Sequence, residues 1–344
     1  MVVLTQLLPG PASSQTGFFI GTLRAGLAGG FAAWLGFTLP SAVLMVLFAA
    51  GVRRFNGPLF EAALHGLQLA AIAVVADAVL RMARVLCPDL PRAAMALLAT
   101  LLVWAASGSL AQILAILLGA VLGALFLPPP HAANRNSDLP VTRGQAMACF
   151  ALFAVLFAAL ELAPERFTDV RLPRAFYQTG SLVFGGGHVV LPLLDQAVVR
   201  PGWVDPKDFL AGYGAAQAIP GPLFSFAGYL GFVAKIRPNG VLGAVLCIIA
   251  LFLPGLLLGA AAAPFWLAVR KHDRARSMLA GVNAAVVGLL LVALVRAATS
   301  GIYQGASGYA ITALAFAALL SRRVSPVVVV LTSSALAMAM AVIR

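Results

Sequence analysis

Charged residues are scarce in this sequence. They make up 10% of the 344 residues, whereas a soluble domain carries about 25%. Hydrophobic residues make up 62%, and apolar runs of about 16–25 residues recur along the whole chain. A β-barrel would instead show strict alternation of apolar and polar residues. The composition therefore excludes a soluble protein and predicts an all-α polytopic membrane protein that has the lipid bilayer as its surroundings.

Acidic residues and cysteines are scarcer still. Eleven Asp and Glu face 23 Lys and Arg, which gives a net charge of +12. These cations are spread over many short loops, which is typical of cytoplasmic loops and argues against a nucleic-acid partner. The three cysteines have no paired spacing and the four histidines share no ligand spacing, so we expect no disulfide, metal site or cofactor. With no nucleophile–base set either, we expect that the protein is not an enzyme.

The tripeptide Pro-Gly-Pro occurs twice inside apolar segments, at residues 9–11 and 220–222. Proline lacks an N–H group and clashes with the preceding turn, so each copy must break a helix. In lipid, broken backbone is tolerated only where protein or a polar cavity satisfies it, and paired breaks in two halves point to a transporter's binding site. The substrate-binding candidates at these breaks are Gln6, Pro9, Gly10, Pro11, Ser13, Ser14 and Gln15 in the first copy, and Gln217, Pro220, Gly221, Pro222 and Ser225 in the second.

The half-helix that follows each break exposes free N–H groups and the positive end of its dipole. Hydroxyl and amide side chains accompany both ends. Two such ends that converge near the middle of the membrane would suit an oxygen-rich anion bound by neutral donors. The alternative is a pair of kinked helices that serve only packing.

A second candidate motif lies within the apolar segment at about 174–198. Its substrate-binding candidates are Gly185, Gly186, Gly187 and His188. Three consecutive glycines interrupt a helix and allow close approach of a ligand or another backbone. An ionisable residue inside a membrane is a functional candidate, and His188 could counter an anion, donate a hydrogen bond or relay a proton. A hydrogen-bonded packing histidine is the alternative.

Asp77 and Arg81 are four residues apart in an apolar segment and are expected to form an ion pair within one helix. We favour a structural role for this pair, and a role in coupling transport to an ion is the alternative.

Hydropathy predicts about 12 spans. They cover approximately 1–24 (broken at 9–11), 27–50, 62–83, 91–106, 109–127, 144–163, 174–198, 208–235 (broken at 220–222), 240–264, 276–298, 305–320 and 324–343. Both broken segments are expected to cross the membrane.

Several positions recur at a slowly drifting offset. The segment 6–11 matches 217–222 at an offset of 211, Pro40 matches Pro254 at 214, and Gly66 matches Gly281 at 215. We therefore expect a first repeat at 1–127, a linker with one helix at 128–173, and a second repeat at 174–344. An odd number of intervening spans inverts the second repeat. The second repeat has a span ahead of its break and the first has none, so the first N-terminal helix is expected to be lacking.

The basic residues predict an orientation. The inverted arrangement places the 270–276 and 322–323 clusters on one side, together with Arg84, Arg92 and Arg143. The positive-inside rule makes that side cytoplasmic. The pairs at 53–54 and 235–237 fall on the other side and oppose the rule.

The motifs FGGGHVVLPLL at 184–194 and AQAIPGPLFSFAGYLG at 216–231 resemble the second half of the chromate ion transporter family. QLLPGPASSQ at 6–15 is similar to its first half. The resemblance covers essentially the whole chain and is to the long type with two homologous halves. Members of the family normally open with an FGGP-type segment, which this chain lacks.

The resemblance implies export of chromate from the cytoplasm across the bacterial inner (plasma) membrane, which confers chromate resistance. Sulfate is a tetrahedral dianion of similar size, so transport of sulfate or another oxyanion is one alternative. An inactive or purely structural membrane protein is another. A homodimer is compatible with such a protein but no residue pattern indicates one.

Overall fold

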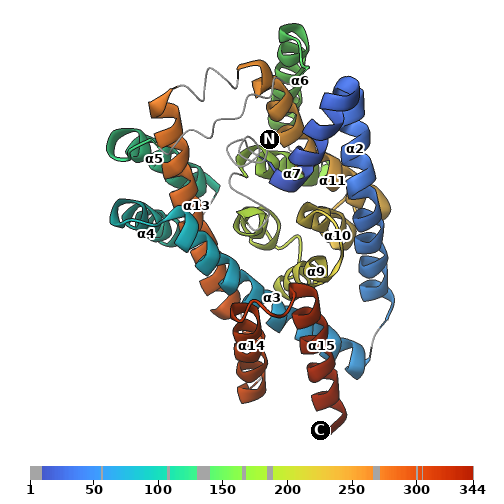
Figure 1. The fold of residues 1–344 in the computed structure, drawn as a ribbon. Coiled ribbons are helices and arrows are strands. Elements are labelled where there is room, and N and C mark those ends of the chain that lie inside the picture. Colours follow the sequence, from blue (N-terminus) through green and yellow to red (C-terminus); the bar gives the residue numbers. More distant parts are fainter. Residues whose placement is uncertain are drawn as a thin grey trace.

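The computed structural model describes residues 10–55, 57–106, 109–129, 140–164, 168–183, 189–265, 272–299, 301–303 and 305–343. Six of the predicted site residues lie outside these ranges: Gln6, Pro9, Gly185, Gly186, Gly187 and His188. Within the described ranges every regular element is a helix. Figure 1 shows the helices arranged around the middle of the molecule, where the N-terminus lies.

The helices in chain order are α2 (Ala12–Arg54), α3 (Pro58–Leu86), α4 (Leu90–Ala105), α5 (Ser109–Phe126), α6 (Arg143–Leu162), η1 (Thr168–Val170), α7 (Arg171–Leu182), α8 (Val190–Leu194), η3 (Asp195–Val199), α9 (Pro206–Ala218), η4 (Leu223–Ser225), α10 (Phe226–Val233), α11 (Gly240–Ala262), η5 (Ala263–Phe265), α13 (Asp273–Thr299), α14 (Gly305–Leu320) and α15 (Pro326–Ile343).

Local sequence signals account for several helix starts. Asp89 caps α4 by accepting a hydrogen bond from the Arg92 N–H, and Thr142 forms a reciprocal capping box with Gln145 at the start of α6. These side chains satisfy N–H groups that the first turn of a helix leaves without partners. Among the described helices, α2, α6, α11, α13 and α15 are long and apolar enough to cross a membrane. The all-helical membrane architecture expected from composition is confirmed to this extent.

The helix α2 consists of two helices that fold back on each other. Ala25 and Gly26 have non-helical backbone angles, with φ of +63° at Gly26, where glycine avoids a steric penalty. A Cβ atom on Gly21 would lie 2.3 Å from the Gly29 oxygen, and the Phe18 and Phe31 rings are 5.2 Å apart. The segment 12–24 therefore runs antiparallel to the segment 27–54, and the turn lies at the boundary that hydropathy predicts.

The helices α9 and α10 also form a hairpin. The Phe209 and Phe226 rings are 5.2 Å apart, and the Lys235 N–H donates to the Trp203 oxygen over 2.8 Å. The chain therefore leaves this segment at the end where it entered. The prediction that the broken segment 208–235 crosses the membrane is wrong, because aromatic contacts along the two arms hold them antiparallel and hydropathy reports only the length of a segment.

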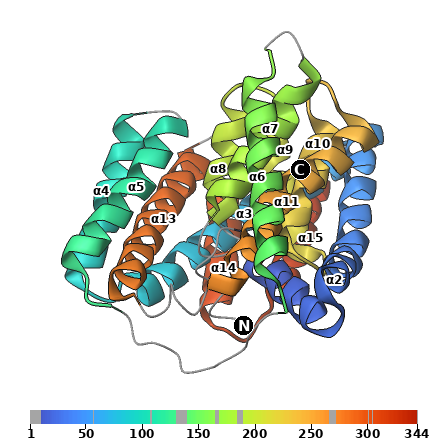
Figure 2. The same cartoon turned by 90° about the horizontal axis from the view of Figure 1, so that it is seen from above.

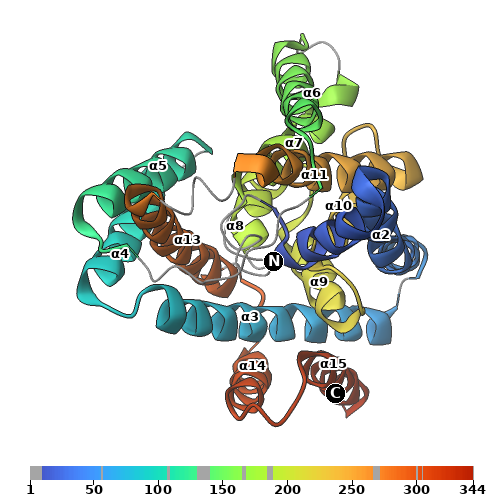
Figure 3. The same ribbon diagram turned by 45° about the horizontal axis from the view of Figure 1, so that its top comes forward.

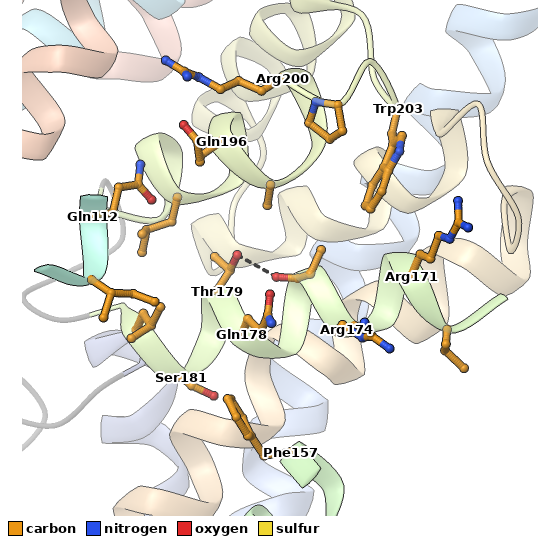
Figure 4. A pocket seen from close by; sticks show the side chains of 17 residues that line it. Gln112, Phe157, Arg171, Arg174, Gln178, Thr179, Ser181, Gln196, Arg200 and Trp203 are labelled. Carbon is orange, nitrogen blue, oxygen red and sulfur yellow. Dashed lines mark hydrogen bonds between the residues drawn. The ribbon is translucent and has the colours of Figure 1, made fainter. Parts of the chain in front are cut away.

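The helices α7 and α8–η3 lie side by side as well, and residues from both line one cavity. Arg171, at the start of α7, and Trp203, after η3, are at the same end of this pair (Figure 4). The described arms of the segment 174–198 thus turn back on each other and do not form the one crossing span that hydropathy predicts.

The last two helices of each predicted half pack on the other half. A Cβ atom on Gly281 of α13 would lie 1.9 Å from the Gly119 oxygen of α5, so the two backbones touch. A Cβ atom on Gly66 of α3 would lie 2.5 Å from the Ser334 Cα of α15. Figure 3 shows α4 and α5 beside α13, and α14 and α15 beside α3. Small residues at these positions permit the close approach typical of membrane helices.

The two ends of the helix bundle are distinguished by their contacts. The Arg53 side chain donates to the Ala234 oxygen at one end, which we call the Arg54 end. At the other end the Arg322 side chain lies 4.0 Å from Asp77, and Leu27 packs with Val141 and Ala263. Figure 2, seen from above, shows α4, α5 and α13 beside one another and apart from α2. Arg53 and Lys235 thus lie at one end of the bundle and Arg322 at the other. The orientation of these ends in the membrane stays a prediction.

Candidate anion site at the two helix breaks

The first break is buried against the second half of the chain. The Gly10 N–H donates to the Val183 oxygen over 2.6 Å, directly ahead of the undescribed residues 184–188. The Gln15 side chain donates to the Gly255 oxygen over 2.9 Å. Gly10 has φ +121°, and a Cβ atom there would lie 3.0 Å from the Gly255 Cα. This position therefore requires glycine for both its conformation and its close contact.

The second break docks on the first half in the corresponding way. Gly221 has φ +138°, and a Cβ atom there would lie 2.5 Å from the Ser41 Cβ. Pro220 and Gly221 are exposed, whereas Gly10 and Pro11 are buried. The Ser225 hydroxyl donates to the Pro222 oxygen over 2.7 Å, which closes the first turn after the break.

The positions that receive the two breaks are equivalent in the predicted repeat, because Ser41 and Gly255 each follow the matched prolines Pro40 and Pro254. Ser41 lies about halfway along the segment 27–54, and Gly255 lies in the second half of α11. The two receiving helices contact each other through Trp34 and Phe252, whose rings are 5.6 Å apart. The breaks therefore lie at mid-height of the bundle on two helices that touch.

Several buried polar groups near the breaks have no hydrogen-bond partner among the described residues. They are the Ser14 hydroxyl, the Thr38 hydroxyl and the Gln217 Nε2 group. Thr38 lies one turn before Ser41, whose hydroxyl donates to the Thr38 oxygen, and the Gln217 side chain lies near Tyr213. An unmet donor buried in a protein costs about 1–3 kcal/mol. Neutral donors of this kind can receive the oxygens of an anion.

The predicted residues thus divide into four groups. Gly10, Pro11, Ser14 and Gln15 lie together at the buried first break, and Gln217, Pro220, Gly221, Pro222 and Ser225 lie together at the second. Ser13 is exposed on the first turn of α2. The remaining six lie outside the described residues. The hydropathy pattern gave no signal for Thr38, which reaches the site only because Ser41 contacts the second break.

The predicted ion pair between Asp77 and Arg81 is confirmed, with a distance of 2.8 Å and a buried carboxylate. Arg322 approaches the same carboxylate from the turn between α14 and α15. The Asp77 carboxylate thus links α3 to the turn between the last two helices through Arg322.

A cavity of about 800 Å³ lies between α5, α6, α7 and the α8–η3 helix. Its lining includes Arg171, Arg174 and Arg200 but no Asp or Glu (Figure 4). The sequence did not predict this cavity, because the three arginines resemble ordinary loop cations at the ends of an apolar segment. The spacing of Arg171 and Arg174, one turn apart on a helix, was the available signal.

The described residues contain no group of three His, Cys, Asp or Glu side chains that could hold a metal ion. Burial and the nearby Asp89 carboxylate raise the pKa of the Cys87 thiol to about 11, so this thiol is protonated at neutral pH.

Comparison with known proteins identifies the family of the chain. The profile described as "Chromate transporter" matches residues 1–124 and 170–339. A "Probable chromate transport protein" of Synechococcus elongatus is 28% identical over 300 residues, which cover 86% of this chain and 72% of the relative. A "Chromate transport protein" of Pseudomonas aeruginosa is 31% identical over 298 residues, 84% of this chain and 68% of the relative. A "Chromate transport protein" of Cupriavidus metallidurans is 23% identical over 299 residues, 86% and 71% respectively. No solved structure matches the chain.

Proposed function

Because this chain belongs to the chromate transporter family, we propose that it exports chromate from the cytoplasm across the bacterial inner membrane and so confers chromate resistance. The observation that carries the proposal is the pair of helix breaks at mid-height, each docked on the other half beside unpartnered neutral donors. Relatives that are named for chromate transport indicate the cargo.

The donor set suits a tetrahedral dianion. Chromate offers four oxygens, and hydroxyl and amide donors can replace part of its hydration shell without forming a tight ion pair that would hinder release. The break at residues 220–222 and the first turn after it supply backbone N–H groups and a helix dipole. Expulsion of a dianion is favoured by an inside-negative potential, at about 2.3 kcal/mol per charge per 100 mV.

We further propose that residues 1–127 and 174–344 are inverted repeats joined by the linker 128–173. Two equivalences support this. Gly10 contacts Gly255, and its equivalent Gly221 contacts Ser41. Likewise, Gly66 contacts α15, and its equivalent Gly281 contacts α5. In this proposal the chromate site lies between the repeats, and movement of one bundle against the other opens it alternately to each side.

Transport in membrane vesicles tests the proposal. Inside-out vesicles that contain the full chain should accumulate radiolabelled chromate when they are energised, and Gln217→Leu should reduce the initial rate about tenfold or more. Lys207→Gln is the matched control, because Lys207 is exposed away from the breaks. Accumulation only in right-side-out vesicles would overturn the export direction. Transport of sulfate that chromate fails to inhibit would identify a different cargo, and no transport of either anion by a well-expressed chain would overturn the function.

His188→Ala, in the segment outside the described residues, belongs in the same assay. Loss of chromate accumulation with normal membrane expression is expected if His188 contacts the anion or relays a proton. Unchanged accumulation would leave His188 with a packing role.

A further inference from the structure

The geometry points to a binding site for an anionic phospholipid in the arginine-lined cavity between α5, α6 and α7. The headgroup phosphate would lie against Arg171 and Arg174, which are neighbours on α7 on the far side of the cavity from Arg200 (Figure 4), and an acyl chain would follow the apolar groove along α5. This site is separate from the proposed chromate site, because none of the predicted residues at the two breaks lines the cavity.

The part of the cavity that Arg171 and Arg174 line is cationic. Arg174 is held in place by a 2.7 Å hydrogen bond from Nη2 to the Ala163 oxygen, and its buried Nε group has no partner among the described residues. Two carboxylates outside the lining have other partners: Glu161 accepts a hydrogen bond from Gln178, and Asp195 interacts with both Arg296 and Arg200. Arginine is well suited to phosphate, because its planar group can donate two parallel hydrogen bonds.

The depth of the cavity matches a headgroup. Trp203 lines it, and the Trp203 oxygen accepts a hydrogen bond from Lys235, whose neighbour Ala234 is bonded to Arg53. The arginines are therefore at the Arg54 end of the bundle. Tryptophan is enriched at the level of the lipid headgroups, where an attracted anionic lipid gains about 1 kcal/mol per Lys or Arg.

A second, apolar cavity of about 450 Å³ continues from the first. The two share Ile113, Ser181 and Leu182. The second cavity then follows α5 to Ala120 and reaches the first turns of α13 at Met278. A small soluble anion gains nothing from such a wall, whereas an acyl chain buries apolar surface against it. This continuity is why we commit to a lipid and not to a free oxyanion.

The outer faces of α5 and α6 support access from the bilayer. Leu114 and Leu117 on α5 and Phe150 on α6 are large hydrophobic side chains that are exposed on the surface of the protein. In a membrane these faces contact lipid, so a phospholipid can enter the apolar groove along α5 sideways without passing through the transport path.

Native mass spectrometry of the purified full chain tests the proposal, with phosphatidylglycerol as the probe and phosphatidylcholine as the zwitterionic comparison. The double variant Arg171→Gln and Arg174→Gln should bind phosphatidylglycerol on the order of 25-fold more weakly, at about fivefold per arginine. The control is Arg54→Gln and Lys207→Gln, which removes two exposed cations at the same end but outside the cavity. The control should keep wild-type affinity.

The apolar groove distinguishes a lipid from a soluble anion. Ala120→Phe should fill the groove and lower phosphatidylglycerol affinity without changing the binding of inorganic sulfate. Met278→Trp serves the same purpose if the first variant fails to fold, because Met278 is 42% exposed. Equal lipid binding by the arginine variant and its control would overturn the proposal. Sulfate binding that depends on the arginines, with lipid binding indifferent to the groove, would overturn the lipid assignment in favour of a free oxyanion.

Discussion

The two Pro-Gly-Pro breaks have the same sequence but different surroundings. At the first, Gly10 and Pro11 are buried, and bonds to Val183 and Gly255 hold the break to the second half. At the second, Pro220 and Gly221 are exposed, and the Ser225 hydroxyl bonds only within its own turn. The tripeptide thus dictates where a helix breaks, while long-range contacts decide whether the break is closed or accessible. In this conformation the second break is the one that an anion can reach.

The largest expected effect comes from a Cβ atom at the breaks. Gly10→Ala should abolish most folded protein, because φ +121° is strained for alanine and the Gly255 backbone cannot move away. The strain alone costs about 1–3 kcal/mol. Gly221→Ala meets a side chain instead, so the second substitution Ser41→Gly should restore part of its stability. Size-exclusion profiles and melting temperatures in detergent measure both.

A contrary result would weaken the comparison directly. If Gly10→Ala is as stable as the wild type, the first break is not locked. If Ser41→Gly restores no stability to Gly221→Ala, then backbone strain and not the side-chain contact limits the second break.

The two glutamines should separate stability from transport. Gln15→Leu removes a buried hydrogen bond to Gly255 and should destabilise the protein by about 1–3 kcal/mol. Gln217→Leu removes an amide donor that has no partner among the described residues, so its melting temperature should stay near that of the wild type while chromate transport falls. Thermal melts and vesicle transport on the same preparations provide the test. Destabilisation by Gln217→Leu equal to that by Gln15→Leu would show that both are structural.

The smallest effects are expected at the two serines. Stability should fall more at the second break, and chromate transport should fall at the first. Ser225→Ala loses the bond to the Pro222 oxygen and should cost about 0.5–1.5 kcal/mol. Ser14→Ala removes a buried hydroxyl without a described partner and should leave stability unchanged or slightly higher, with a reduced rate of chromate transport. A larger loss of stability for Ser14→Ala than for Ser225→Ala would mean that the Ser14 hydroxyl is satisfied.

Much of the local structure could be predicted because its cause is local. Proline chemistry located the breaks, and apolar length located helices such as 143–162 and 326–343 within a few residues. The direction of the chain after a break could not be predicted. It depends on contacts such as Phe209 with Phe226 and Lys235 with Trp203, which hydropathy does not record.

The candidate site shows the same division. Gln217 and Ser225 were found because they flank a visible break, whereas Thr38 belongs to the site through the contact of Ser41 with Gly221, 180 positions away in sequence. The arginine-lined cavity was missed for a related reason. Arg171 and Arg200 face one space only because α7 and α8–η3 lie side by side, and no periodicity in the sequence reports that arrangement.

The exchange of helix pairs between the halves also sets an order of events during synthesis. The helix α3 ends at Leu86, but α14 and α15, which cover it, begin only at Gly305. While the ribosome is still translating the middle of the chain, the face of α3 that will contact α14 and α15 is uncovered. Gly66 on this face cannot yet contact Ser334. A stalled or shortened nascent chain would keep this face open to the insertion and quality-control machinery. Helices α14 and α15, which are synthesised late, therefore complete the packing of α3, which is synthesised much earlier.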